Sequence, residues 1–354
     1  MLYPCLFAIL ALPLAASLQA QAEMPKITGK PVVDAPPMLD WPTDQGPVLP
    51  NLNDPTANIL NDFHAQIADC DLVFSTEGNY YPALKDIWPV FLAKFKDQPL
   101  SNWFYTTSPP VSWDQIENRI LQVGNLYATC RPAVVVAPAK LIARLEQAGH
   151  TEGQVYPLFR DRGQVILVKQ GNPKKIQTVW DLGRKGVRLI TPNPELEPGA
   201  FGNYAGTIYH IAAQDPHPPK GTNAKKLFNQ IFNGGSGDPE KWLAGPRIHH
   251  RDLPWSVAFG KADAAVILYH LGLYTQQTFP DKFALVPLGG TQADPQPLAG
   301  TISNIRYLVR IKGNWTSRQL EAREKLVETL LSDDFTKVLE KRGLTRPPAA
   351  SQAR

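Results

Sequence analysis

The segment PAVVVAPAKLIARLEQAG, residues 132–149, indicates the fold class of this chain. Its first half contains AVVVA, an unbroken apolar run that is typical of a parallel strand covered on both faces. Its second half places apolar residues at helical spacing. A buried strand followed directly by a helix is the repeating unit of α/β proteins, so the segment predicts a parallel sheet flanked by helices.

The same alternation occurs on both sides of this segment. The strand-like run DLVFS precedes a stretch with helical spacing, in which Pro89 is able to introduce a kink. A strand in NWFYTTSPP and a helix over residues 111–124 are predicted next. Further strands are predicted in GQVILVKQGNP, VRLIT, DAAVILY and TISNIRYLVRI, with one or two amphipathic helices near the C-terminus.

The chain is long enough for two lobes, because a single core rarely grows beyond about 250–300 residues. The first 22 residues carry no charge and combine a short apolar core with a final Ala-Gln-Ala, which predicts a secretory signal and a periplasmic location. Eight prolines between residues 23 and 55 favour an extended arm. We expect a signal peptide at residues 1–22, a proline-rich arm at 23–68, lobe 1 at 69–164 and 302–346, lobe 2 at 165–301, and a tail at 347–354.

Charge and cysteine content narrow the class of protein further. The formal net charge is +4 and the basic residues are spread thinly, so the sequence does not indicate a nucleic-acid partner. Cys70 and Cys130 each precede a predicted strand, and they would lie side by side if those strands are parallel neighbours. A disulfide and a pair of free buried thiols both remain open, whereas a zinc site needs more ligands.

Polar or small residues follow several predicted strands at the points where ligands bind in open α/β sheets. The segment from Pro198 also opens a predicted helix, whose first backbone N–H groups are free to bind an anion. Serine and threonine at such places also serve as helix caps or turn formers. The candidate binding residues are Ser75, Thr76, Thr107, Ser108, Pro138, Ala139, Gly199, Ala200 and Tyr269.

The motifs of several other classes do not match. Gly199, Gly202 and Gly206 fit neither the phosphate-binding loop nor the dinucleotide fingerprint, so no nucleotide site is expected. No nucleophile is paired with a histidine at a recognisable spacing, and no Gly-x-Ser-x-Gly elbow occurs. We therefore expect no catalytic residue, no metal and no cofactor.

Four segments, taken in chain order, resemble the extracellular solute-binding proteins of ABC importers, nearest to the molybdate and tungstate branch. They are LVFSTEGNYYPALKDIWPVFLAKF, PAVVVAPAKLIARLEQAG, VILVKQGNPKKIQTVWDLGRKGVRLITPNPELEPGAFGNYA and GKADAAVILYHLGLY. The resemblance implies a type II periplasmic binding protein, in which two α/β lobes joined by a two-stranded hinge close over an anion. It also implies a monomer whose partners are a small anion and an ABC permease.

By motif position, the resemblance assigns ligand contacts to Ser75, the Pro138-Ala139 turn, Ala200 beside Gly199, and Tyr269. The sequence differs from the molybdate pattern in the bulky residues that follow Ser75 and in the lack of a serine after VVVAP. It also has the insertion HHRDLPW. An organic carboxylate as ligand, and a membrane sensor in place of the permease, are the alternatives.

The insertion admits three interpretations. A metal site would find only Asp252 as a further local ligand for the two histidines. A structural role would have Asp252 cap a helix that begins at Pro254, with Arg251 in a surface ion pair. A binding role would place Arg251 at the cleft, where its guanidinium donates two hydrogen bonds to an oxyanion or carboxylate. His249 or His250 would add positive charge as the pH falls.

Overall fold

The computed structural model describes residues 23–33, 65–67, 70–107, 113, 116, 121–123, 126–128, 130–246 and 248–347. The expected signal peptide, most of the arm, Ser108 and residues 348–354 lie outside the described residues. Within these ranges, no helix combines the length and the apolar character that a membrane crossing requires.

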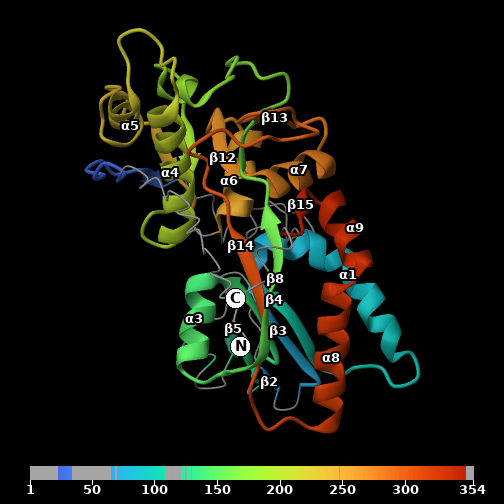
Figure 1. The fold of residues 1–354 in the computed structure, drawn as a ribbon. Helices are drawn as coiled ribbons and strands as arrows, with labels where there is room; N and C mark the ends of the chain where they lie inside the picture. Colours follow the sequence, from blue (N-terminus) through green and yellow to red (C-terminus); the bar gives the residue numbers. More distant parts are fainter. Residues whose placement is uncertain are drawn as a thin grey trace, which may run out of the picture.

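Lobe 1 is the lower lobe in Figure 1 and is built on a six-stranded mixed sheet. In spatial order its strands are β15 (Leu344–Thr345), β8 (Thr151–Asp161), β14 (Ile305–Ile311), β7 (Val134–Pro138), β3 (Leu72–Glu77) and β4 (Trp103–Thr107). Its helices are α1 (Tyr81–Leu92), α3 (Ala139–Gln147), α8 (Ser317–Leu331) and α9 (Asp333–Lys341). Strands β4, β3 and β7 run parallel, as the strand-helix alternation predicts.

Strand β7 shows why this sheet needs helices on both faces. Val134 and Val136 point into the core beneath α1 and α8, whereas Val135 and Ala137 point into the core beneath α3. All four side chains are almost fully buried. The unbroken apolar run AVVVA therefore corresponds to a strand with two covered faces, as predicted.

Lobe 2 is the upper lobe and contains a second six-stranded mixed sheet (Figure 1). Its strands, in spatial order, are β1 (Val32–Val33), β11 (Trp242–Ala244), β10 (Leu189–Thr191), β12 (Ala264–Leu268), β9 (Gln164–Lys169) and β13 (Phe283–Pro287). Its helices are α4 (Pro198–Gln214), α5 (Ala224–Phe232), α6 (His249–Ala258) and α7 (Tyr269–Thr278). The beginning of the arm thus belongs to this lobe, because β1 pairs in parallel with β11.

A third, small sheet differs from the prediction. It joins β2 (Ala65–Ile67), β6 (Leu126–Ala128) and β5 (Leu121–Val123). The predicted helix over residues 111–124 is wrong at its end, because residues 121–123 form β5. Leu-Gln-Val alternates apolar and polar residues, and the Gly-Asn sequence that follows favours a tight turn into an antiparallel partner.

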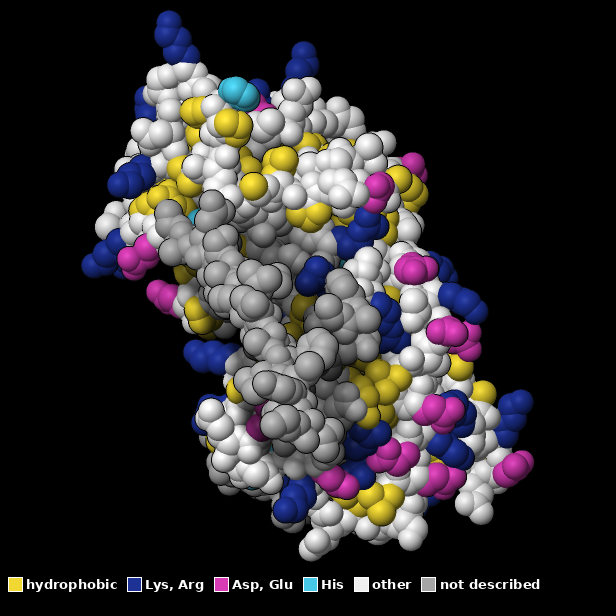
Figure 2. Space-filling model, viewed as in Figure 1, with side chains coloured by type: hydrophobic (Ala, Val, Ile, Leu, Met, Phe, Trp, Pro, Cys, Tyr) yellow, Lys and Arg dark blue, Asp and Glu magenta, His cyan; other side chains and the backbone are white. Residues whose placement is uncertain are grey.

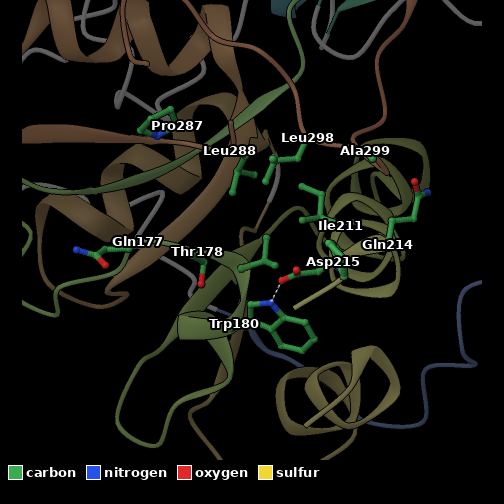
Figure 3. A pocket seen from close by; sticks show the side chains of 12 residues that line it. Gln177, Thr178, Trp180, Ile211, Gln214, Asp215, Pro287, Leu288, Leu298 and Ala299 are labelled. Atoms are coloured by element: carbon green, nitrogen blue, oxygen red, sulfur yellow. Dashed lines mark hydrogen bonds between the residues drawn. The ribbon is translucent and has the colours of Figure 1, made fainter. Parts of the chain in front are cut away.

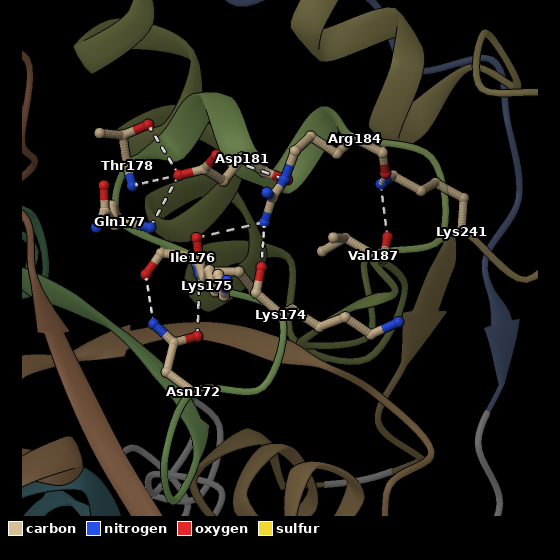
Figure 4. Close-up of polar contacts among 10 residues, drawn as sticks. All are labelled: Asn172, Lys174, Lys175, Ile176, Gln177, Thr178, Asp181, Arg184, Val187 and Lys241. Atoms are coloured by element: carbon tan, nitrogen blue, oxygen red, sulfur yellow. Dashed lines mark hydrogen bonds and ion pairs between the residues drawn. The ribbon is translucent and has the colours of Figure 1, made fainter.

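A polar network holds the loop that joins β9 to β10 in lobe 2 (Figure 4). The ammonium group of Lys241 is buried and donates hydrogen bonds to the carbonyl oxygens of Arg184 and Val187, at 2.7 and 2.5 Å. Burial lowers the pKa of Lys241 to about 8. The carboxylate of Asp181 accepts the backbone N–H groups of Gln177 and Thr178, so hydrogen bonds fix the loop in its middle as well as near β10.

The surface charges of lobe 1 are mixed. Figure 2 shows basic and acidic side chains interspersed over the lower lobe on the visible face. Ion pairs occur along α8, such as Lys325 with Glu321 at 2.7 Å. This distribution agrees with the thin spread of charge along the sequence.

Two adjacent segments carry the chain between the lobes. The first leads from β8 through Gly163 into β9, and the second leads from residue 301 into β14. Asp161 lies where they meet, and its buried carboxylate accepts hydrogen bonds from the backbone N–H groups of Gly163 and Asn304, at 3.1 and 2.9 Å. The two crossings are therefore tied to each other at the interface of the lobes.

Cys70 and Cys130 form a disulfide, with their Cα atoms 5.7 Å apart. Each precedes one of the parallel neighbours β3 and β7, in which Phe74 is paired with Val134. The structure confirms the disulfide that the positions of the two cysteines allowed. The bond lies at the amino ends of these strands, whereas the cleft described below lies at their carboxyl ends.

We predict that the double variant Cys70→Ala, Cys130→Ala has a free energy of unfolding lower by about 4 kcal/mol, because the disulfide closes a loop of 60 residues. Urea unfolding of both proteins measures the difference. A reducing agent should destabilise the wild type and leave the double variant unchanged. Equal unfolding midpoints without reductant would contradict the prediction.

Candidate ligand-binding cleft

A cavity of about 620 Å³ lies between the two lobes and is lined by residues from both. Its volume is within the range of about 300–1,000 Å³ that is typical of small-molecule sites. Lobe 1 contributes Glu77, Gly78, Asn79, Pro138, Asn304 and Arg306. Lobe 2 contributes Leu196, Glu197, Gly199, Ala200, Asn203, Tyr204, Ile248, His249, His250 and Leu268.

The wall from lobe 1 is dominated by Arg306, on strand β14. Its guanidinium makes a two-pronged contact with Glu77, in which Nε and Nη2 donate to the two carboxylate oxygens at 3.0 and 3.1 Å. Burial alone would lower the pKa of Arg306, but its interactions with Tyr80 and Glu77 outweigh this effect and raise the pKa. Its third nitrogen, Nη1, is buried and has no hydrogen-bond partner among the described residues. One cationic donor therefore remains for a ligand.

The wall from lobe 2 contains a second acid-base pair. Glu197 accepts hydrogen bonds from Nδ1 of His249 at 2.7 Å and from the backbone N–H of His249 at 2.9 Å. The other ring nitrogen, Nε2, is buried and has no partner among the described residues. The same is true of Nδ1 of His250.

The first turn of α4 also faces the cavity, through Gly199 and Ala200. Pro198 begins the helix, and Glu197 precedes it without a side-chain capping bond. A Cβ atom built on Gly199 would meet no heavy atom within 4 Å, so the backbone is accessible there. The first N–H groups of a helix have no partner within it and carry a partial positive charge, which suits an anion.

One side of the cleft is closed by contacts between the lobes. Nε2 of His270, on α7, donates to the backbone carbonyl of Asn79 at 3.1 Å. The ring of Tyr80 stacks against His270 with the ring centres 5.2 Å apart. Burial lowers the pKa of His270 to about 3, so the ring is neutral near pH 7.

The structure places the predicted residues in several settings. Gly199, Ala200 and Pro138 line the cleft. Ser75 and Thr76 line an adjoining cavity of about 410 Å³, which shares Glu77 and Pro138 with the cleft. Thr107 ends strand β4, and Ala139 begins α3 on the surface without lining either cavity.

Tyr269 and Arg251 lie outside the lining of the cleft. Tyr269 is buried, and its hydroxyl group donates to the carbonyl oxygen of Gln292 at 2.9 Å. Arg251 is partly buried in the first turn of α6. Among the described residues, the cation that lines the cavity is Arg306.

The insertion HHRDLPW forms the start of α6, which begins at His249 and not at Pro254 as predicted. Asp252 lies inside the first turn, and its carboxylate accepts the backbone N–H of Ile248 at 2.7 Å. Burial is the largest cause that lowers the pKa of His250 well below 6.5, and the nearby His249 and Arg251 lower it further. Of the two histidines named for this role, His250 is therefore not expected to gain charge between pH 7 and 6.

Sequence reasoning missed Arg306, Glu197 and the neutral state of His250. Arg306 had one visible signal, because it is a charged residue inside the strand-like run IRYLVRI. A charge at a position that faces the core is expected to be paired or functional. Glu197 had no comparable signal, since an acidic residue before a helix is common.

A third cavity, of about 330 Å³, lies in lobe 2 between α4, β13 and the loop after β9 (Figure 3). Trp180 and Asp215 line it, and the indole N–H donates to the carboxylate at 2.7 Å. This hydrogen bond is the main cause that lowers the pKa of Asp215. Because no buried polar side-chain atom of its lining lacks a partner, this cavity offers less to a polar ligand than the cleft does.

The two α/β lobes meet at a cleft whose walls carry hydrogen-bonding nitrogen atoms without partners among the described residues. Residues 115–345 match the family described as bacterial extracellular solute-binding protein, and the chain belongs to this family. No curated protein matches the sequence. The family is extracellular, and its described role is solute binding.

Several solved structures are similar to this chain. The sulfate-binding protein SubI from Mycobacterium tuberculosis H37Rv is 19% identical, with a TM-score of 0.53, over 82% of this chain and 90% of that chain. Peb3 from Campylobacter jejuni is 16% identical, with a TM-score of 0.45, over 80% and 100% of the two chains. Iron-bound HitA from Pseudomonas aeruginosa is 14% identical, with a TM-score of 0.46, over 80% and 89%. At these identities the likeness to SubI concerns the fold alone.

We predict that the free energy of unfolding falls between pH 7 and pH 5. In this range an unfolded histidine, with a pKa of about 6.5, takes up a proton, whereas buried His270 does not. The unfolded state is therefore stabilised relative to the folded state as the pH falls. His270 alone should account for about 2 kcal/mol of the loss. Urea unfolding at the two pH values measures it.

The variant His270→Gln provides the control, because glutamine can still donate to the carbonyl of Asn79 and does not titrate. Its loss of stability between pH 7 and pH 5 should be smaller by about 2 kcal/mol than that of the wild type. Between pH 8 and pH 7 the two proteins should behave alike. The same loss in both proteins between pH 7 and pH 5 would show that His270 does not carry the effect.

Proposed function

We propose that the protein captures a small anionic solute in the cleft between its lobes and delivers it to an ABC importer. The observation that carries this proposal is that both walls offer donors without partners among the described residues. Nη1 of Arg306 belongs to lobe 1, and the first N–H groups of α4, at Gly199 and Ala200, belong to lobe 2. An anion is the ligand that satisfies both sets at once.

Capture would work by closure of the lobes. A ligand that contacts only one lobe stabilises the open and closed forms equally, whereas a ligand that bridges Arg306 and α4 stabilises the closed form. The crossings at Asp161 and Asn304 provide the hinge. The closed form is then the one that a membrane permease distinguishes from the empty protein.

Two classes of anion fit the proposal. A molybdate-like oxyanion is supported by the resemblance of the sequence segments and by the N–H groups of α4. An organic carboxylate is supported by the cavity of about 620 Å³, which is much larger than a tetrahedral oxyanion requires. The carboxylates of Glu77 and Glu197 are each paired with a protein group, Arg306 and His249 respectively, so the lining leaves room for either class.

The remaining parts of the proposal concern location and partners. The extracellular family supports a periplasmic or secreted protein. A monomer that meets an ABC permease is the proposed form, and a membrane sensor that reads the same liganded state is the alternative partner. Mass spectrometry of ligand retained under native conditions, with elemental analysis for molybdenum and tungsten, identifies the solute. A retained cation, or no affinity for any anion, would contradict the proposal.

We predict that Arg306→Lys weakens binding of the retained anion at least tenfold, because a hydrogen bond to a charged group contributes about 1.5–3 kcal/mol. Arg310→Lys is the matched control. Arg310 lies on the same strand and is paired with Glu324 in the same two-pronged manner, but it lies outside the cleft. Calorimetry on both variants should show lost affinity in the first and wild-type affinity in the second; equal affinities would exclude Arg306 from the site.

We also predict that Ala200→Leu weakens binding at least tenfold while the protein still folds, because the larger side chain enters the cleft beside the first N–H groups of α4. Gly202→Leu is the control on the same helix, since Gly202 does not line the cavity and has open space beside it. Calorimetry gives the affinities, and circular dichroism confirms the fold. Wild-type affinity in Ala200→Leu would remove the helix terminus from the site.

A further inference from the structure

Two buried nitrogen atoms on opposite walls of the cleft lack partners, and they differ in chemistry. Nη1 of Arg306 only donates hydrogen bonds, because a guanidinium has no lone pair to offer. Nε2 of His249 either donates or accepts, depending on where the ring carries its proton. Both side chains are at least nine-tenths buried, at 6% and 4% exposure, so water does not easily replace a missing partner.

Glu197 determines which nitrogen of His249 carries the proton. A carboxylate oxygen accepts hydrogen bonds, so Nδ1, at 2.7 Å from Oε1, must be the donor. The other carboxylate oxygen accepts the backbone N–H of His249 at 2.9 Å, which holds Glu197 in place. In the neutral ring, Nε2 then has a lone pair that accepts a hydrogen bond from the cavity.

Several groups pack around the ring of His249. The ring of Tyr204 packs edge-on against it, with the ring centres 5.5 Å apart, and burial raises the pKa of that hydroxyl. His250 lies at 5.5 Å and burial keeps it neutral near pH 7. Arg306 lies across the cleft, and Arg251 lies on the same helix. Glu197 is the one carboxylate in contact with the ring among the described residues.

We propose that the cleft selects an anion that also carries a hydrogen-bond donor, either a hydroxyl or an ammonium group. The anionic group accepts from Nη1 of Arg306 and from the N–H groups of α4, while the donor group binds Nε2 of His249. This inference rests on the proposed function, since it requires an anion in the cleft. An anion without a donor leaves Nε2 buried and unpaired, which weakens binding roughly 5- to 150-fold.

The experiment compares anions that share a carbon skeleton. L-malate, L-aspartate and succinate are four-carbon dicarboxylates that differ in a hydroxyl, an ammonium or a hydrogen at one carbon, and glycerate and propionate extend the comparison to monocarboxylates. Calorimetry at pH 7.5, with molybdate and sulfate as oxyanions, gives the affinities. We expect at least one donor-bearing compound to bind more than fivefold tighter than its donor-free counterpart. The malate and aspartate arms distinguish the hydroxyl from the ammonium group.

Two substitutions of His249 separate the contributions of its ring nitrogens. His249→Asn places an amide near the position of Nδ1, so the contact with Glu197 is kept and the acceptor at Nε2 is lost. His249→Gln places its amide near the position of Nε2 and keeps an acceptor there. The asparagine variant should lose the preference for the donor-bearing anion and keep its affinity for the donor-free one. The glutamine variant should retain part of the preference, and His217→Asn, on the surface of lobe 2, should behave as wild type.

Results other than the expected ones contradict either the inference or the proposed function. Equal affinities within each pair, or binding of molybdate or sulfate alone, would overturn the inference and leave the proposed function intact. Uptake of one proton when succinate binds, measured in two buffers of different ionisation enthalpy, would mean that a charged His249 donates, and this also overturns it. No binding of any anion would refute the proposed function itself.

Discussion

The buried carboxylate of Asp161 is the constraint on which the cleft depends. It accepts the N–H groups of Gly163 and Asn304, one from each crossing between the lobes, and the backbone N–H of Asp161 donates to the carbonyl of Asn304 at 3.2 Å. Burial raises the pKa of Asp161 although these hydrogen bonds oppose the shift. The carboxylate satisfies the buried N–H of Gly163 and the partly buried N–H of Asn304, which would otherwise lack this partner.

This arrangement determines where the binding residues lie. Arg306 follows Asn304 by two residues on β14, so the direction of its side chain is set by the same crossing. Gly163 has φ of 76°, and a Cβ there would come within 2.9 Å of the side chain of Thr301 in the second crossing. Glycine is therefore required both for the left-handed backbone and for the close approach of the two segments. Small changes at this point would alter the distance between the walls that hold Arg306 and His249.

Most of the fold could be predicted because its signals are local. The run AVVVA and the helix after it carry their burial pattern in adjacent residues, and the matching positions of Cys70 and Cys130 allowed the disulfide. Elements that depend on distant partners could not be predicted. Strand β1 contains two residues, both valine and both exposed, and only β11 makes them a strand. The end of the predicted helix at residues 121–123 became β5 because tertiary pairing overrode helical spacing.

The candidate site was predictable only in part, for the same reason. The rule that ligands bind beyond strand ends located Pro138, Gly199 and Ala200 at positions that line the cleft. It could not locate Arg306, whose partner Glu77 is 229 residues away in sequence. It also gave no means to see that Tyr269 points toward Gln292, since one step along a helix changes the direction of a side chain by about 100°.

The position of β1 has a consequence for how the protein assembles. Val32 is paired with Leu243, and the backbone N–H groups of Thr28 and Gly29 donate to the side chain of Asn233. These contacts span more than two hundred residues, and contacts of such sequence separation slow folding because a long loop must close first. Residues near position 30 are synthesised early and find their place only after β11 has been made. Until β1 has paired with it, the edge of β11 remains open to pairing with other chains, so chaperone protection during this interval would matter more for lobe 2 than for lobe 1.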